Sequence, residues 1–194
     1  MNDFFLAKNG QMILPLNEVE YAVGQVCMRD FDKWLSFSEP VKKFINGREL
    51  TDDLLNELTQ DFFGECVSLC QIVVKDFVVD LSCLLHIASF IAVVIQANQA
   101  YFAEKEDEPK AKPKKKQSEK KDKTTWFDSF QILVSHGHSH ESIMNMTYGA
   151  FTEYLKAIKR RDQEQMIQQV NLMRIAYSAD GAGFSKFIHD MQCG

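Results

Sequence analysis

The 22 residues from Leu81 to Phe102 carry no charged side chain, which makes this the longest uncharged stretch of the chain. Its apolar residues recur every three or four positions, and the pattern starts a few residues upstream. The positions of this stripe are Val74, Phe77, Val78, Leu81, Leu84, Leu85, Ala88, Ile91, Ala92 and Ile95. Side chains with this spacing lie on one face of an α-helix. The spacing therefore predicts one long helix over residues 67–102. Because burying each large side chain contributes about 1.5–3 kcal/mol, we expect this helix to form the core.

The same stretch is long enough to cross a lipid bilayer, which takes about 20 apolar residues. Three features argue against a membrane span. The stretch contains the polar residues Ser82, His86, Ser89, Gln96, Asn98 and Gln99. A window moved upstream takes in Lys75, Asp76 and Asp80, and each charge costs about 2.5–3.5 kcal/mol near the bilayer centre. The hydrophobicity is also confined to one face. We therefore expect a soluble core helix and no membrane partner, with a single-pass membrane-associated accessory protein as the alternative.

Charge is unevenly distributed along the chain. Residues 104–123 contain nine lysines, six acidic residues and two prolines, but no large apolar residue. A segment of this composition cannot bury enough apolar surface to fold by itself, so we expect a flexible linker over residues 104–124. A lysine run can also bind nucleic acid or a membrane, but the interspersed acidic residues favour a solvated tether. Because the formal net charge is −5, the rest of the chain is acidic, and we expect no nucleic-acid partner.

Residues 1–103 are predicted to form a helical domain with a small N-terminal β-hairpin. Asn9-Gly10 is a strong signal for a hairpin turn, and it lies between the short runs 3–7 and 11–16.

Turn and cap residues divide the helical part of this domain. Asn17 is a candidate N-cap for the first helix. After a break at residues 36–40, Pro40 begins the second helix. Asn46-Gly47 forms a turn, and Thr51 caps the helix that leads towards the long core helix.

Residues 125–194 are predicted to form a small helical module. A helix that begins at Thr147 ends at the basic run Lys159-Arg160-Arg161, and Asp162 caps the next helix. Asp180–Gly183 is a stop signal, and a last short helix follows it. The apolar face of the helix after Asp162 contains Met166, Ile167, Val170, Met173, Tyr177 and, in part, Ile175.

The sequence offers little for catalysis or metal binding. Its five cysteines form no C-x-x-C pair, so we expect free, buried thiols in a reducing compartment. The N-terminus lacks the pattern of a secretory signal, which favours the cytoplasm. His136, His138, His140 and Glu141 are a candidate metal cluster, but Gly137 disfavours a helix here and a polar turn is the better interpretation. No catalytic or phosphate-binding motif is present, so we expect neither enzymatic activity nor a cofactor.

Four short motifs occur in order near the C-terminus. They are I-x-N-M-T at Ile143–Thr147, F-x-x-Y-L at Phe151–Leu155, a basic run at Lys159–Arg161, and R-x-A-x-x-A-D-G-x-G-F-x-K-F at Arg174–Phe187. On these motifs, roughly the last 60 residues resemble the C-terminal module of tail assembly chaperones of long-tailed bacteriophages, the module that a ribosomal frameshift adds in that family. The order of a helical domain, a low-complexity tether and a smaller module also resembles the layout of that family.

The resemblance implies a chaperone that acts in the host cytoplasm during tail assembly. It implies that the N-terminal domain binds apolar helices of the tape measure protein and that the C-terminal module recruits tail tube subunits. We expect the tape measure protein to contact Phe77, Leu81, Leu84, Ile91 and Ile95. We expect the tail tube protein to contact Lys159, Arg160, Arg161, Arg174, Phe184 and Phe187. Self-association is possible, and a phage protein that binds and inhibits a host factor is a further alternative.

Overall fold

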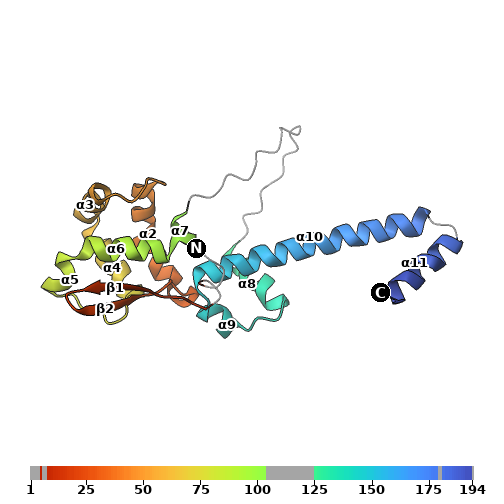
Figure 1. Cartoon of the computed structure of the whole chain (residues 1–194), viewed down its shortest axis with the longest axis horizontal. Coiled ribbons are helices and arrows are strands. Elements are labelled where there is room, and N and C mark those ends of the chain that lie inside the picture. The colour runs from red at the N-terminus through yellow and green to blue at the C-terminus, as the bar shows by residue number, and fades with distance from the viewer. Residues whose placement is uncertain (1–4, 6–7, 104–124, 179–180, 194) are drawn as a thin grey trace. The chain divides into compact units, whose positions relative to one another are not determined.

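The computed structural model of the chain describes residue 5 and residues 8–103, 125–178 and 181–193. The chain is mainly α-helical with one small antiparallel β-hairpin near the N-terminus, which confirms the predicted fold class (Figure 1). It divides into two compact units, Met1–Glu153 and Tyr154–Gly194. The expected linker, residues 104–124, lies outside the described residues.

The hairpin lies further along the chain than predicted. Strand β1 (Met12–Leu16) pairs with strand β2 (Val19–Val23) in an antiparallel register. The two residues between them, Asn17 and Glu18, have φ angles of 48° and 66°. Positive φ at both central residues gives a two-residue turn the twist that a hairpin needs, and asparagine tolerates this conformation. The prediction that Asn17 caps a helix is therefore wrong. Of the run 3–7 that was expected to pair across Asn9-Gly10, only Phe5 is among the described residues.

Helix α2 (Phe31–Ile45) follows a short 3₁₀ helix, η1 (Met28–Asp30). Pro40 lies inside α2, so the predicted break at this point is wrong. A proline in a helix interior costs about 3 kcal/mol, because it removes one hydrogen bond and crowds the preceding turn. The helix continues through Pro40 because Trp34 and Val41, on either side of it, are both fully buried.

The next turn and cap agree with the sequence predictions. Asn46 ends α2 in the left-handed conformation, with a φ of 45°. The Thr51 hydroxyl then accepts a hydrogen bond from the Leu54 N–H at 3.2 Å and caps α3 (Asp52–Asp61). Helix α4 (Phe63–Val73) comes directly after it. Both signals succeed because they depend on neighbouring residues alone.

The predicted core helix over residues 67–102 is not continuous. Four helices and a loop stand in its place: α4, the loop 74–80, α5 (Leu81–Leu85), α6 (Ile87–Ala97) and α7 (Gln99–Phe102).

Contacts outside the helix explain the main interruption. Val74 leaves α4 because it pairs with Val23 at the end of β2. Asp76 has a φ of 59°, which no α-helix accommodates. The Asp80 carboxylate then accepts a hydrogen bond from the Cys83 N–H at 2.8 Å and caps α5. The apolar stripe is therefore divided between separate elements.

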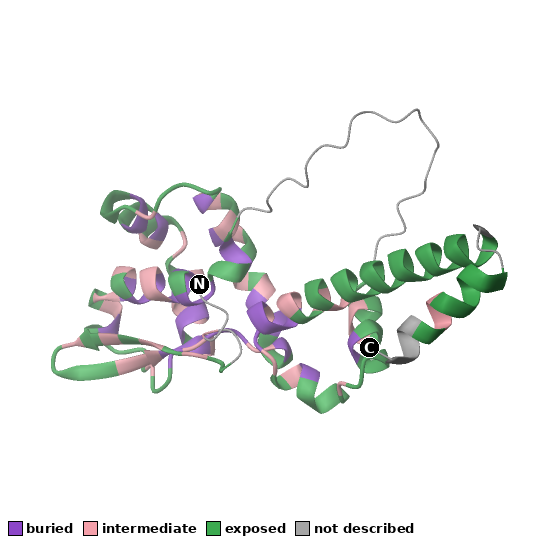
Figure 2. Ribbon diagram, turned by 45° about the vertical axis from the view of Figure 1, so that its right-hand side comes forward, coloured by how far each residue is buried: buried purple, intermediate pink, exposed green. Residues whose placement is uncertain are grey.

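Helix α6 lies at the centre of the first unit. It packs against α3, α4 and the hairpin. Its side chains Phe90, Ile91 and Val94 are fully buried, and buried residues concentrate where these elements meet (Figure 2). Of the predicted stripe on this helix, Ile91 and Ile95 are buried and Ala88 and Ala92 are half-buried. The fully buried Phe90 and Val94 lie outside the stripe, so the face that forms the core is only partly the predicted one.

Asn98, directly after α6, connects the core to the segment that follows β2. Its Oδ1 accepts a hydrogen bond from the Val26 N–H at 2.7 Å. Its Nδ2 donates to the carbonyl oxygens of Gly24 at 3.2 Å and Val94 at 2.9 Å. The side chain is buried, so these three bonds replace the water that the groups would otherwise bind.

Residues beyond the linker also belong to the first unit. Helices α8 (Trp126–Ser135) and α9 (His140–Asn145) precede α10 (Tyr148–Ser178). The Met28 N–H donates to the Met146 carbonyl and the Tyr148 N–H donates to the Val26 carbonyl, both at 2.9 Å.

An aromatic cluster joins the same segments. The Phe31 ring stacks on Tyr148 at 4.6 Å and meets the rings of Trp126 and Tyr101 edge-on at 5.2 Å and 5.9 Å. The boundary between the compact units consequently falls after Glu153, whereas the sequence suggested domains on either side of residues 104–124.

Helix α10 is continuous from Tyr148 to Ser178. The predicted division between Arg161 and Asp162 is therefore wrong. Lys, Arg, Gln and Glu, which are good helix formers, dominate residues 156–169 around this point, and the one glycine of the helix, Gly149, lies in its first turn. A final helix, α11 (Gly181–Cys193), follows as predicted.

A capping box begins α8 and gives a pH-dependent prediction. Asp128 accepts hydrogen bonds from the Thr125 N–H at 2.7 Å and from its hydroxyl at 2.8 Å, and these bonds lower the pKa of the Asp128 carboxyl. The cap should be fully formed above the ordinary pKa of aspartate and lost as the pH falls through the lowered pKa. A Thr125→Val substitution should raise the pKa of Asp128 in an NMR titration of its carboxyl carbon. An unchanged pKa would show that the hydroxyl contributes nothing to this cap.

Candidate functional site

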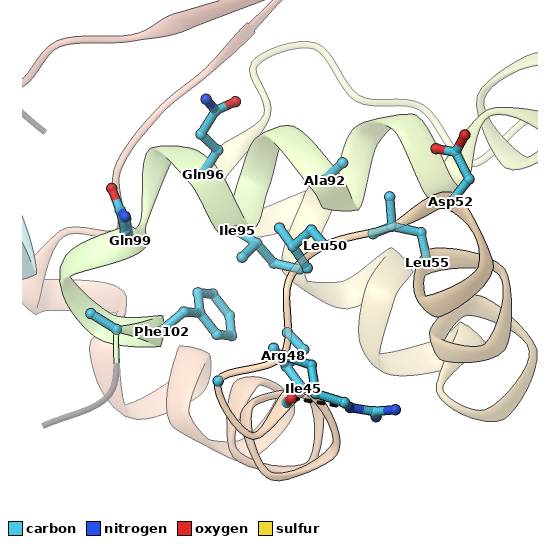
Figure 3. A pocket seen from close by; sticks show the side chains of 12 residues that line it. Ile45, Arg48, Leu50, Asp52, Leu55, Ala92, Ile95, Gln96, Gln99 and Phe102 are labelled. Carbon is cyan, nitrogen blue, oxygen red and sulfur yellow. Dashed lines mark hydrogen bonds between the residues drawn. The ribbon is translucent and has the colours of Figure 1, made fainter.

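An apolar groove lies beside α6 in the first unit. Its volume is about 760 Å³, and its walls come from the end of α2, the α2–α3 loop, the start of α3, and helices α6 and α7 (Figure 3). The apolar side chains that line it are Ile45, Leu50, Leu55, Ala92, Ile95 and Phe102.

Polar side chains occupy the rim of this groove. Asp52 lies at one end of the groove, and Gln99 lies at the other end beside Phe102 (Figure 3). The guanidinium of Arg48 donates to the carbonyl of Phe44 at 2.5 Å and lies over the Phe44 ring, 4.8 Å from its centroid. An apolar floor with a thin polar rim is the arrangement that binds an amphipathic helix.

A second cavity of about 470 Å³ adjoins the groove, since Gly47 and Phe102 line both. Aromatic rings dominate its walls, among them Tyr101 and Trp126. The Lys42 ammonium lies 4.4 Å from the centroid of the Tyr101 ring and donates a hydrogen bond to the Tyr101 carbonyl. Burial raises the pKa of the Tyr101 hydroxyl. This second cavity, with the Lys42 ammonium and the aromatic rings in its walls, continues the groove past the end of α7.

The structure does not gather the five residues expected to contact the tape measure protein. Ile95 lines the groove, whereas Ile91 is fully buried in the core. Phe77 and Leu84 are half-buried, and Phe77 meets the Phe90 ring at 5.1 Å. Leu81 is 73% exposed, and Val78, Val79 and Leu85, which are close to it in the sequence, are exposed as well.

The residues expected to contact the tail tube protein all lie in the second unit. Lys159, Arg160, Arg161 and Arg174 are exposed on α10. On α11, Phe184 is exposed and Phe187 is half-buried.

Sequence reasoning missed most of the groove. Leu50 and Leu55 lie outside the core helix that the sequence predicted, and Phe102 is the last residue of that helix but not part of its apolar stripe. The one available signal was the Asn46-Gly47 turn, which folds the α2–α3 loop back beside the core. Only the packing of α6 and α7 against the region from the end of α2 to the start of α3 brings these residues together.

The histidines of the candidate metal cluster and the cysteines are considered next. The Nδ1 atom of His136 lies 2.9 Å from the Ile132 carbonyl oxygen. Within the described part of the chain, no group of three His, Cys, Asp or Glu residues is placed to hold a metal ion. Cys66, Cys70 and Cys83 are buried and free, as expected, and burial raises the pKa of Cys66 to about 12. A thiol with so high a pKa is a poor nucleophile.

Among the helices of the described ranges, none combines the length and the apolar character that crossing a membrane requires. Comparison of the chain with models of known protein families, with curated protein sequences and with solved structures gives no match.

Proposed function

We propose that this protein is a non-enzymatic tail assembly chaperone of a long-tailed bacteriophage, acting in the host cytoplasm. The first unit would bind an apolar helix of the tape measure protein in the groove beside α6. The second unit would recruit tail tube subunits through the basic turn of α10 and the phenylalanines of α11.

The groove carries this proposal. A helix binds a groove through apolar side chains at positions i, i+3 or i+4, and i+7, and these need an apolar floor of several residues. Six apolar side chains supply such a floor here, and Gln96 and Gln99 can pair with polar groups along the edge. The four C-terminal motifs support the same function independently.

The two proposed contacts should respond differently to salt. Binding in the groove depends on apolar burial and should change little between 50 mM and 500 mM salt. Docking through Lys159, Arg160 and Arg161 uses exposed charges and should weaken over the same range.

A tryptophan at Gln96 tests the groove directly. Gln96 is exposed and lines the groove, so Gln96→Trp should fill it without disturbing the core. We expect at least a tenfold loss of affinity for the tape measure protein, because the bound helix loses its apolar contacts. Co-purification from cells that express both proteins, followed by titration of the purified pair, measures the loss.

Gln71→Trp is the matched control, because Gln71 is also exposed, lies on α4 and does not line the groove. Equal binding by the two variants would place the contact outside the groove. Failure of the wild-type chain to bind the tape measure protein at all would contradict the proposed function itself.

A further inference from the structure

The second unit presents an apolar stripe that is exposed to solvent. Met166, Val170, Met173 and Tyr177 follow one another on α10 at steps of four, three and four residues, so they lie in one row. Their exposed fractions run from 58% to 96%. Lys159 lies in the same row, two helical turns before Met166.

The rest of this unit leaves the stripe uncovered. Helix α11 is amphipathic, but its Phe184 is itself 42% exposed. A row of large apolar side chains on the surface of a soluble protein marks an interaction site. The chain therefore presents an apolar groove in one unit and an apolar helix in the other.

Charge indicates how these two features fit together. The first unit, residues 1–153, contains sixteen Lys and Arg against twenty-three Asp and Glu, whereas the second, residues 154–194, contains six against four. Next to the groove, Glu49, Asp52 and Asp53 accompany the single cation Arg48 among residues 48–53, whereas Lys42 and Lys43 line the cavity that adjoins the groove at Phe102. A parallel pair of α10 helices would set basic turn against basic turn, while the acidic unit offers that turn the opposite charge.

We propose that the α10 stripe of one chain docks into the groove of a second copy of the same chain. Met166, Val170 and Met173 would lie on the apolar floor of the groove. Lys159, about 10 Å further along the helix, would lie towards the end of the groove that carries Asp52. Self-docking keeps both apolar surfaces covered until a partner helix displaces α10.

The proposal rests on the same groove as the proposed function, but its test contains no other protein. Self-docking can therefore fail while tape measure binding stands, and the converse also holds.

Sedimentation velocity of the full chain over a range of concentrations tests the proposal. The wild-type chain should associate as its concentration rises. The double substitution Met166→Gln and Met173→Gln should raise the dissociation constant at least tenfold, because it removes the apolar anchors and keeps good helix formers. Gln96→Trp, which fills the groove, should raise it by a similar factor.

Matched controls separate these effects from general damage to the helices. Leu172→Gln with Ile175→Gln removes two apolar side chains from other faces of α10 and should leave association within about twofold of the wild type. Gln71→Trp should behave in the same way. Far-UV circular dichroism shows whether each variant keeps its helices.

Mixing the two disrupted variants gives the decisive result. One variant keeps an intact groove and the other keeps an intact stripe, so an equimolar mixture should form a heterodimer although each variant alone is monomeric. A stripe variant that dissociates while Gln96→Trp still associates would show that α10 pairs with α10. Monomeric wild-type chain at all concentrations, or a mixture that stays monomeric, would also overturn the proposal.

Discussion

Replacing Asn98 by alanine is expected to lower the free energy of unfolding by about 3 kcal/mol. The substitution removes three hydrogen bonds and leaves the Val26 N–H and the Gly24 carbonyl without their side-chain partner. A buried polar group that loses its partner costs about 1–3 kcal/mol, because no water replaces the bond. Since Asn98 connects α6 to the segment after β2, the loss should affect the whole first unit.

Urea denaturation followed by far-UV circular dichroism measures this change. Gln96→Ala is the control, since Gln96 is exposed on the same part of the chain and should change stability by less than about 0.5 kcal/mol. A loss of less than about 1 kcal/mol for Asn98→Ala would mean that these three bonds do not hold the two segments together.

Phe31→Ala is expected to have the largest effect, a loss of about 4 kcal/mol. The Phe31 ring is buried and contacts Tyr101, Trp126 and Tyr148, which come from α7, α8 and α10. Truncation leaves a cavity at the point where these three helices meet α2, and the surrounding rings cannot all move in to fill it.

For this variant, tryptophan fluorescence and circular dichroism should report the same unfolding transition. Both probes should place its midpoint at a lower urea concentration than in the wild-type chain. Phe63→Ala, at an exposed position of α4, should cost less than about 1 kcal/mol. Trp34 and Trp126 both lie in the first unit. Two separate transitions in the tryptophan fluorescence of the wild-type chain would therefore show that α8 and α9 unfold apart from the N-terminal helices, contrary to the shared aromatic cluster.

Two local signals in the sequence predicted local structure correctly, whereas the caps expected at Asn17 and Asp162 do not form. The Thr51 cap and the Asn46 turn each depend on a hydrogen bond or a φ angle within a few residues, so tertiary packing leaves them unchanged. Two asparagines compete as hairpin turns, and the strand pairing selects Asn17 because Val19–Val23 can then pair with residues 12–16.

Longer predictions failed where tertiary contacts outweigh helical periodicity. The stripe over residues 67–102 has helical spacing throughout, but pairing of Val74 with Val23 and the positive φ of Asp76 break it. The opposite error occurred at Pro40, where burial of the neighbouring side chains keeps α2 intact. Helical periodicity showed which apolar residues could share one face of a helix. It could not show that these residues belong to several separate helices and a loop.

The division into functional halves also depends on packing. Tyr148 and Phe151 lie beyond the expected linker, yet they pack in the first unit. A separate fragment of residues 1–103 would therefore lose part of its aromatic cluster, and binding experiments should use the full chain.

A photo-cross-linking side chain at Gln99 tests the central proposal most directly. Gln99 is exposed and lies at one end of the groove, so a probe there should reach any helix that occupies it (Figure 3). In cells that also express the tape measure protein, irradiation should link the chain to an apolar helix of that protein, and a probe at Gln71 should not. Cross-links of equal yield from both positions, or none from Gln99 while the two proteins still co-purify, would contradict binding in the groove.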